Sequence, residues 1–237
     1  MNIEADSKGN GTLYVVSTPI GNLDDLSPRA KEVLANVEIV ACEDTRVTGG
    51  LLARMEIERP KLTSYRDENE ADQSVQLVDA LSQGNSIALV ADAGTPTISD
   101  PGFRLVRACQ AANIPVRSVP GPCAVTAALS ISGLPTNRFY FCGFLPPKSA
   151  ARKRFLEEHS EFPSTLVLYE SVHRIEKFLN EIVEILGEKR TLSVSRELTK
   201  KFESTTTGQA VIVREKVLAQ ARKGEYVVLI APASFEL

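Results

Sequence analysis

Histidine is scarce in this sequence of 237 residues, and its few cysteines lie far apart. The two histidines, His159 and His173, are too few and too widely separated to suggest a metal centre. The four cysteines include no C-x-x-C pair, so neither a zinc site nor a disulfide framework is expected. Scattered thiols of this kind are typical of a reduced, cytoplasmic protein, and no metal is predicted.

Long apolar runs and a signal peptide are also missing. No run approaches the roughly 18 apolar residues of a membrane-spanning helix, so no membrane association is expected. Residues 1–11 are polar and acidic, which predicts a disordered tail rather than a secretion signal. The net charge of −3 provides no global attraction to nucleic acid, so any RNA contact must come from local basic patches.

Two common nucleotide-binding motifs do not occur. No G-x-G-x-x-G follows the first expected strand, which disfavours an NAD-type site or an ordinary methyltransferase nucleotide site. No G-x-x-x-x-G-K-[ST] is present, which argues against a P-loop ATPase.

The first half of the chain alternates strand and helix patterns, and 43% apolar residues suffice for a sizeable core. Alternation of this kind predicts a mostly parallel sheet covered by helices. The expected strands are residues 12–17, 37–42, 61–65, 86–91 and 116–119. The expected helices are 28–36, capped by Ser27, then 69–83, with a buried stripe of Ala71, Val75, Val78 and Leu81, and 103–112.

Pro120-Gly121-Pro122 interrupts this pattern and is interpreted as a domain boundary, which gives an α/β domain at 12–119 and a second at 120–237. Closely spaced strands in the second half predict a mixed sheet flanked by helices. The expected helices are 124–132, 152–159, 172–186 and 214–223. The expected strands are 139–142, 165–169, 190–195, 203–207 and 226–231.

Four strands of the first half run into loops of unusual composition. The loops begin at Thr18, Glu43, Asp92 and Pro120, and the third reads DAGTPTISDPG. Because the carboxyl ends of parallel strands converge, the loops are expected to build one ligand cleft. In the third loop Gly94 would admit close backbone approach, although a tight strand-to-helix turn is the plainer alternative.

Several strings occur in one fixed order: LYVVSTPIGNLDDLSPRA, EDTR, DAGTPTISDPG, PGPCAVTAALSISGLP, GFLPPK, YESVHR and RELTKKFE. In this order they closely resemble the ribosomal small-subunit RNA cytidine 2′-O-methyltransferases, within the tetrapyrrole methylase superfamily. The resemblance runs from about Leu13 to Ala231. It implies two α/β domains with S-adenosylmethionine (SAM) in the cleft between them. It also implies a SAM-dependent enzyme that methylates the ribose 2′-hydroxyl of a cytidine in 16S rRNA.

The resemblance also carries over a set of cofactor positions, most of them backbone contacts. The third loop matches the segment that grips SAM, and the other positions match strand ends and the pair after the boundary prolines. The expected cofactor-binding residues are Pro19, Ala93, Gly94, Thr95, Ile98, Cys123, Ala124, Glu170 and Ala231.

A ribose hydroxyl is a weak acid, so the reaction benefits from a carboxylate that accepts its proton or a lysine that stabilises the alkoxide. The catalytic candidates are Glu43, Asp44, Asp100 and Lys200. Plainer roles stay open for each of them. The EDTR segment fits a capped helix start with a local salt bridge, Asp100 fits a simple N-cap before Pro101, and Lys200 fits a charged edge strand.

The densest basic cluster is expected to hold rRNA phosphates, and Arg46 to orient a phosphate through its fork. The cluster comprises Lys148, Arg152, Lys153 and Arg154, and an exposed, solvated helix face is the plainer alternative. No aromatic-rich platform accompanies it, so the expected substrate is 16S rRNA within a partly assembled small subunit rather than an isolated strand. A homodimer is expected from the resemblance.

Two departures from that family leave alternatives open. Val47 stands where members often have His, and the sequence ends at Leu237 where many continue into a helical extension, whose RNA contacts would then be absent or supplied otherwise. One alternative is a methylase of the same superfamily acting on a porphyrin or corrin precursor. The other is a non-catalytic RNA-binding assembly factor with a degenerate SAM cleft.

Overall fold

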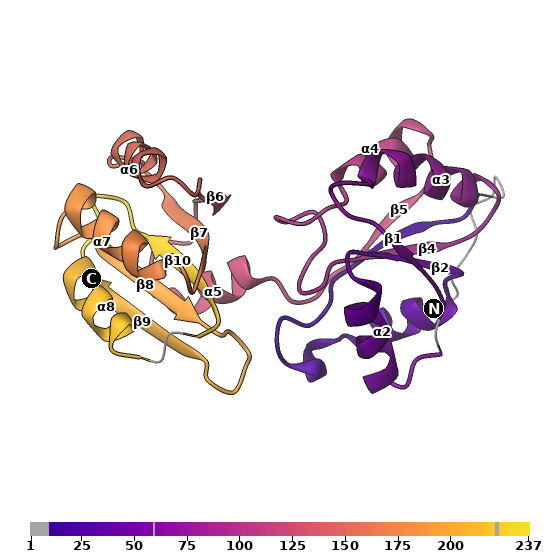
Figure 1. Cartoon of the computed structure of the whole chain (residues 1–237), viewed down its shortest axis with the longest axis horizontal. Helices are drawn as coiled ribbons and strands as arrows, with labels where there is room; N and C mark the ends of the chain where they lie inside the picture. Colours follow the sequence, from indigo (N-terminus) through magenta and orange to yellow (C-terminus); the bar gives the residue numbers. More distant parts are fainter. Residues whose placement is uncertain (1–9, 59, 221–222) are drawn as a thin grey trace. The chain divides into compact units, whose positions relative to one another are not determined.

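The computed structural model describes residues 10–58, 60–220 and 223–237 (Figure 1). The chain divides into two compact units, one ending at Cys123 and the other beginning at Ala124. The division falls a few residues beyond the boundary expected at Pro120. Most of the predicted disordered tail, residues 1–9, lies outside the described residues.

The first unit is built on a parallel sheet of five strands in the order β3-β2-β4-β1-β5. The strands are β1 (Leu13–Val16), β2 (Ile39–Cys42), β3 (Lys61–Ser64), β4 (Ile87–Val90) and β5 (Val116–Val119). The helices are η1 (Leu23–Asp25), α1 (Pro28–Asn36), α2 (Thr45–Arg54), α3 (Glu70–Ser82) and α4 (Phe103–Ala111).

Helices cover both faces of this sheet, which explains why its strands read as continuous apolar runs. On one face Val16, Val40 and Val90 pack with residues of α1 and α2. On the other face Leu13 and Leu89 pack with residues of α3 and α4. The predicted α/β class with a covered parallel sheet is confirmed.

Local signals set the start of α1, whereas tertiary contacts overrule the pattern of α3. The Ser27 hydroxyl accepts a hydrogen bond from the amide of Ala30, 3.1 Å away, as its capping role requires. The predicted apolar stripe on α3 is correct for Leu81, which is buried, and for Val78, which packs against the core, but it is wrong for Ala71, which is exposed, and for Val75, which is 63% exposed. The buried stripe instead includes Glu70 and Ser74, whose polar atoms are satisfied by hydrogen bonds to the buried hydroxyl of Tyr65.

The second unit contains a mixed sheet of five strands in the order β6-β7-β10-β8-β9, as predicted for this half. Its strands are β6 (Phe139–Phe144), β7 (Thr165–Ser171), β8 (Thr191–Arg196), β9 (Ser204–Gln209) and β10 (Glu225–Ile230). Strands β6 and β7 are parallel, and the other neighbours are antiparallel. Its helices are α5 (Ala124–Ser132), α6 (Ser149–Glu158), α7 (Ile175–Leu186) and α8 (Ala210–Leu218).

Helices α6, α7 and α8 contribute to one large core on a single face of this sheet, and α5 contacts β10, β8 and β9. The helix expected at 214–223 begins earlier, at Ala210, because the amide of Ala210 donates to the carbonyl of Arg190 and β9 passes directly into the helix. Among the described residues no helix is long and apolar enough to span a membrane.

Candidate cofactor and catalytic loops

Three of the four predicted loops of the first unit are tied together by hydrogen bonds. Thr18, after β1, and Gly94, after β4, exchange two backbone hydrogen bonds of 2.9 and 3.1 Å. The Thr95 hydroxyl lies 2.9 Å from the hydroxyl of Ser17 and donates to the carbonyl of Pro122, 3.0 Å away. These hydrogen bonds therefore connect the loops after β1, β4 and β5 to one another.

The loop after β2 joins the same group through a carboxylate. The Asp92 side chain accepts a hydrogen bond of 3.0 Å from the amide of Asp44. All four loops thus meet at the carboxyl ends of the strands, as the strand pattern predicted. That they enclose a ligand cleft stays a prediction.

Close packing between loops explains the glycines at these positions. A Cβ at Gly121 would lie 3.0 Å from Cβ of Ser17, and one at Gly94 would lie 3.3 Å from Cγ2 of Ile20. Gly94 has a φ of 90°, which other residues adopt only with strain. The small residues therefore serve the contact between loops, whatever they also do for a ligand.

The third loop carries unusual backbone strain. Thr97 and Ser99 have φ values of 74° and 64°, a region that a β-branched residue such as threonine rarely adopts. Gly102 has a φ of 139°, and a Cβ there would lie 2.8 Å from side-chain atoms of both Leu89 and Thr97. Strain of this kind persists where surrounding structure enforces a loop shape, which is common at functional sites.

The prediction that Asp100 caps the following helix is wrong. Helix α4 begins at Phe103, and Gly102 occupies the N-cap position. The capping acceptor is Glu70 of α3, whose Oε1 accepts hydrogen bonds from the amides of Gly102 (3.1 Å) and Arg104 (3.2 Å). A buried carboxylate from another helix thus takes the role that spacing alone assigned to Asp100.

Asp100 lies instead among other carboxylates. Burial, followed by the charges of Glu43, Asp92 and Asp67, raises the pKa of Asp100 from 3.8 to about 7. Burial and the charges of Asp92 and Asp67 also raise the pKa of Glu43. A carboxyl group with a pKa near neutrality can accept a proton and release it again at physiological pH. Sequence reasoning selected Glu43 and Asp100 but missed Asp92 and Asp67. Asp92 lies two residues after β4 and Asp67 three residues after β3, so both belong to loops at strand ends.

Asp44 and Arg46 adopt the plainer arrangement considered from sequence. Asp44 is the N-cap of α2 and accepts hydrogen bonds from the amide (2.8 Å), Nε (3.1 Å) and Nη2 (2.6 Å) of Arg46. The hydrogen bonds from Arg46 lower the pKa of Asp44, so Asp44 is a poor proton acceptor. The Arg46 side chain is 87% exposed.

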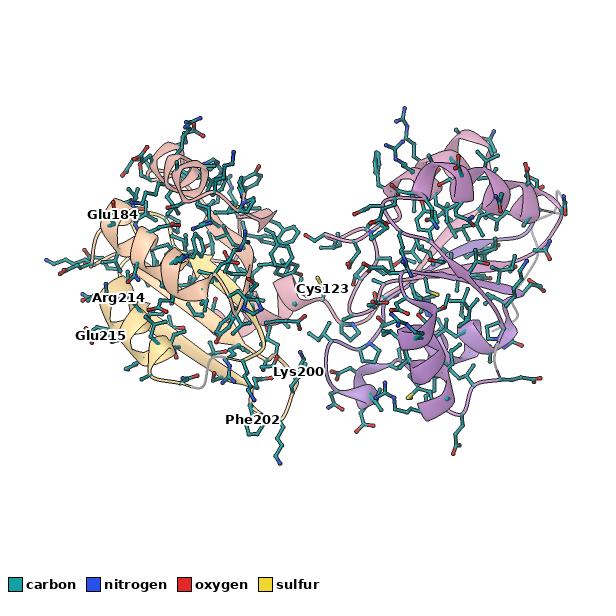
Figure 2. The ribbon with its side chains drawn as sticks, viewed as in Figure 1. Cys123, Glu184, Lys200, Phe202, Arg214 and Glu215 are labelled. Carbon is teal, nitrogen blue, oxygen red and sulfur yellow. The ribbon has the colours of Figure 1, made fainter. Side chains whose placement is uncertain are left out.

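The second unit holds the remaining catalytic candidate, Lys200, on the loop between β8 and β9, where Figure 2 also shows Phe202. The ammonium group of Lys200 lies 2.9 Å from a carboxylate oxygen of Glu197 and 2.9 Å from one of Glu225. Burial lowers the pKa of Lys200, but hydrogen bonds to both carboxylates outweigh it and raise the pKa overall. Lys200 is therefore a fixed positive charge, not a base.

Two predicted cofactor residues of this unit, Glu170 on β7 and Ala231 after β10, lie beside opposite ends of β10. Glu170 pairs with Tyr226 near the start of β10, whereas Ala231 directly follows its end. At about 3.3 Å per residue, one molecule touching both would have to lie along this strand. Glu170 is 2% exposed and bonded through Oε1 to Arg174 at 2.8 Å, while its buried Oε2 has no hydrogen-bond partner among the described residues.

The predicted basic cluster does not form one exposed face. Arg152 is 2% exposed, and its guanidinium makes two hydrogen bonds of 2.8 and 2.7 Å with Glu181, so its assignment to RNA phosphates is wrong. Arg152 lies on the buried face of helix α6, where the bidentate contact with Glu181 compensates its charge. Lys153 pairs with Glu184 at 2.7 Å, and Lys148 and Arg154 are exposed.

A broader charge signal in the printed sequence was missed. Between Pro101 and Leu156 there is no Asp or Glu. The same stretch contains Arg104, Arg107, Arg117, Arg138, Lys148, Arg152, Lys153 and Arg154. A chain with a net charge of −3 therefore concentrates positive charge in its middle, which suits a polyanionic partner.

Solved structures share this fold. Diphthine synthase matches with a TM-score of 0.69 at 13% identity over 93% of this chain and 90% of that chain. Uroporphyrin-III C-methyltransferase from Thermus thermophilus, complexed with S-adenyl homocysteine, matches with a TM-score of 0.62 at 18% identity over 92% and 97%. The methyltransferase CobJ matches with a TM-score of 0.66 at 18% identity over 94% and 95%. The fold is thus one that several methyltransferases share.

Sequence comparison narrows this class. The family model of the tetrapyrrole (corrin/porphyrin) methylases matches residues 12–211. The ribosomal RNA small subunit methyltransferase I of Xylella fastidiosa is 49% identical over 94% of this chain and 82% of its own length, and that of Escherichia coli O157:H7 is 46% identical over 96% and 80%. The chain belongs to the tetrapyrrole methylase family and, within it, to the group of these rRNA methyltransferases.

Proposed function

We propose that this chain transfers a methyl group from SAM to the ribose 2′-hydroxyl of a cytidine in 16S rRNA. One observation carries the choice of substrate. The chain is 46–49% identical to small-subunit rRNA methyltransferases over more than nine-tenths of its length. It is only 16–21% identical to the porphyrin and corrin methyltransferases of the same fold. Substrate sites diverge faster than folds, so the RNA enzymes are the better guide.

The chemistry of the first unit's loops fits SAM. A sulfonium and an ammonium group make part of this cofactor cationic. Asp92 and Asp100 of the third loop, together with Glu43 after β2, place several carboxylates close together there. When bound, SAM supplies a methyl group already activated by the sulfonium. The residues proposed to hold it in this unit are Pro19, Ala93, Gly94, Thr95, Ile98 and Cys123.

In the second unit Ala124, Glu170 and Ala231 remain proposed cofactor residues. Glu170 has the strongest support of the three, because its buried Oε2 has no hydrogen-bond donor among the described residues. A buried carboxylate oxygen without a donor is costly unless a ligand supplies one. A ribose hydroxyl or an ammonium group would supply such a donor.

Asp100 is the residue proposed to accept the proton from the ribose hydroxyl. Its pKa of about 7 makes it a stronger base than an ordinary carboxylate, yet leaves it ionised in much of the population at neutral pH. Asp44 is bound by Arg46, and Lys200 is held by two carboxylates. Lys200 remains a candidate only for stabilising negative charge on the ribose oxygen.

The partners follow from the same proposal. The substrate is proposed to be 16S rRNA in a partly assembled small subunit in the cytoplasm, and the enzyme a homodimer. Phosphate contacts are assigned to Arg46, Lys148, Lys153 and Arg154. Lys153 would have to exchange its bond to Glu184, and Arg46 would have to exchange its bonds to Asp44 to present its fork. Sedimentation tests the dimer, and a single monomeric species would refute it.

Mass spectrometry of 16S rRNA tests substrate and reaction together. In cells lacking the gene for this chain, one cytidine should lose its ribose methyl group, and wild-type protein should restore it. An unchanged methylation pattern would refute the proposal. Incorporation of labelled methyl groups into purified small subunits, compared with uroporphyrinogen, separates the RNA enzyme from a porphyrin methylase. Calorimetry without detectable SAM binding would favour the assembly factor.

A further inference from the structure

Strand β6 lies at the edge of the second unit's sheet and carries an irregularity that reorients its last ring. Phe139 pairs with Thr165 and Phe141 with Val167, but the register then shifts, so that Phe144 pairs with Tyr169. Paired residues of neighbouring strands face the same side of a sheet. Without the shift, Phe144 would point to the opposite face, since strand residues alternate. The shift therefore puts Phe139, Phe141, Phe144 and Tyr169 on one face, here called the aromatic edge.

Three rings of the aromatic edge contact one another, and two of its four rings are exposed to solvent. Tyr169 meets Phe141 and Phe144 at ring-centroid distances of 5.1 and 5.5 Å. Phe139 is 44% exposed and Phe144 58%. Helix α5 packs on β10, β8 and β9, and the aromatic edge lies on the two strands beyond them. Exposed large apolar side chains clustered in this way mark an interaction surface.

Tyr140 lies on the same strand, but its ring packs against other side chains of the second unit and is not part of the aromatic edge. It pairs with Leu166, a residue of the large core, and therefore faces the side of α6 and α7. Tyr140 is 46% exposed, but its ring stacks on His159, with a centroid distance of 6.1 Å and an interplanar angle of 4°. Tyr140 thus provides a matched internal control of similar exposure on the opposite face.

Two positively charged residues flank strand β6 in the sequence. Arg138 precedes β6, Lys148 follows it, and both side chains are exposed. Both belong to the stretch from Pro101 to Leu156 that contains no Asp or Glu. A second copy of this chain seated on the edge about a two-fold axis would place these cations against their own counterparts. A polyanion would instead neutralise them.

We propose that the aromatic edge is a stacking platform for unpaired bases of the RNA substrate, with Arg138 and Lys148 holding the adjacent phosphates. Exposed phenylalanine and tyrosine rings on a sheet face recognise single-stranded RNA in this manner. The inference rests on the proposed function and replaces the expectation that no aromatic platform is present. Unpaired loops of an assembling subunit provide such bases.

Binding of a fluorescent twelve-nucleotide oligocytidine and of purified small subunits tests the platform. The double variant Phe139→Leu/Phe144→Leu keeps apolar bulk but removes two π faces, and its Kd for both probes should rise about fivefold or more. The dependence of Kd on salt should stay unchanged. Lys148→Gln should instead reduce the salt slope by about 0.7, because one phosphate contact is lost.

Controls keep the result interpretable. Tyr140→Leu should leave the Kd unchanged, and Phe144→Tyr, which keeps a ring, should bind like wild type. If the leucine double variant binds RNA as tightly as wild type, and wild type methylates subunits, the platform proposal is wrong while the proposed function stands. Loss of a dimer in sedimentation at unchanged RNA affinity would assign the edge to a second copy and also overturn it. A wild-type protein that binds SAM but neither binds nor methylates RNA would refute the proposed function itself.

Discussion

Replacing Asp100 by asparagine should impair catalysis while making the folded protein more stable at alkaline pH. In the folded chain burial and neighbouring carboxylates raise the pKa of Asp100 from 3.8 to about 7. The unfolded chain ionises this group with its ordinary pKa. The contribution of Asp100 to wild-type stability therefore falls as pH rises from about 4 to about 7, because ionisation is favoured in the unfolded state, and it levels off above that range.

The magnitude follows from the size of the pKa shift. A shift of this size corresponds to about 4 kcal/mol without screening. Solvent reaches part of the carboxyl group, so about 1–2 kcal/mol is the reasonable expectation. The difference in free energy of unfolding between Asp100→Asn and wild type should therefore be about 1–2 kcal/mol larger at pH 8 than at pH 4, in favour of the variant.

Activity should change in the opposite direction. Loss of a general base costs about 100-fold or more in rate, and the wild-type rate should rise with pH through an apparent pKa of about 7. Urea unfolding at several pH values and methyl transfer to small subunits measure the two effects. A variant that is less stable at pH 8, or that loses less than about tenfold in activity, would show that Asp100 has a structural role instead.

Three further substitutions test a neighbour of Asp100, the strained glycine before α4 and the buried ion pair of α6. Glu43→Gln removes a charge that raises the pKa of Asp100, so the rise of the wild-type rate with pH should move to lower pH; a fixed profile would contradict the coupling. Gly102→Ala should lower the free energy of unfolding in urea by about 1–3 kcal/mol, because the φ of 139° is strained for alanine. Arg152→Ala should cost about 3–5 kcal/mol by leaving Glu181 charged and buried, while the salt slope of RNA binding in the folded fraction stays that of wild type.

Much of the fold could be read from local signals. The expected helix at 124–132 and strand at 116–119 coincide with α5 and β5. Helix α7 ends where Gly187 adopts a φ of 88°, as a glycine after a long apolar periodicity predicts. Such signals depend on a few adjacent residues, so they act before any tertiary contact forms. The sequence predicts no range for helix α2, because the EDTR segment indicates a helix start only as one of two alternatives.

The alternation of strands and helices in the sequence is enough to predict that the loops after β1, β2, β4 and β5 meet, because parallel strands direct their carboxyl ends to one edge of the sheet. Which carboxylates remain available at that edge depends on tertiary contacts that local sequence does not reveal. Glu70 reaches from α3 to cap α4 and leaves Asp100 among Glu43 and Asp92. Likewise Glu181 draws Arg152 into the core, and a register shift turns Phe144 outward. These outcomes depend on residues far apart in the chain, whose contacts decide whether a charge is buried and paired or left exposed.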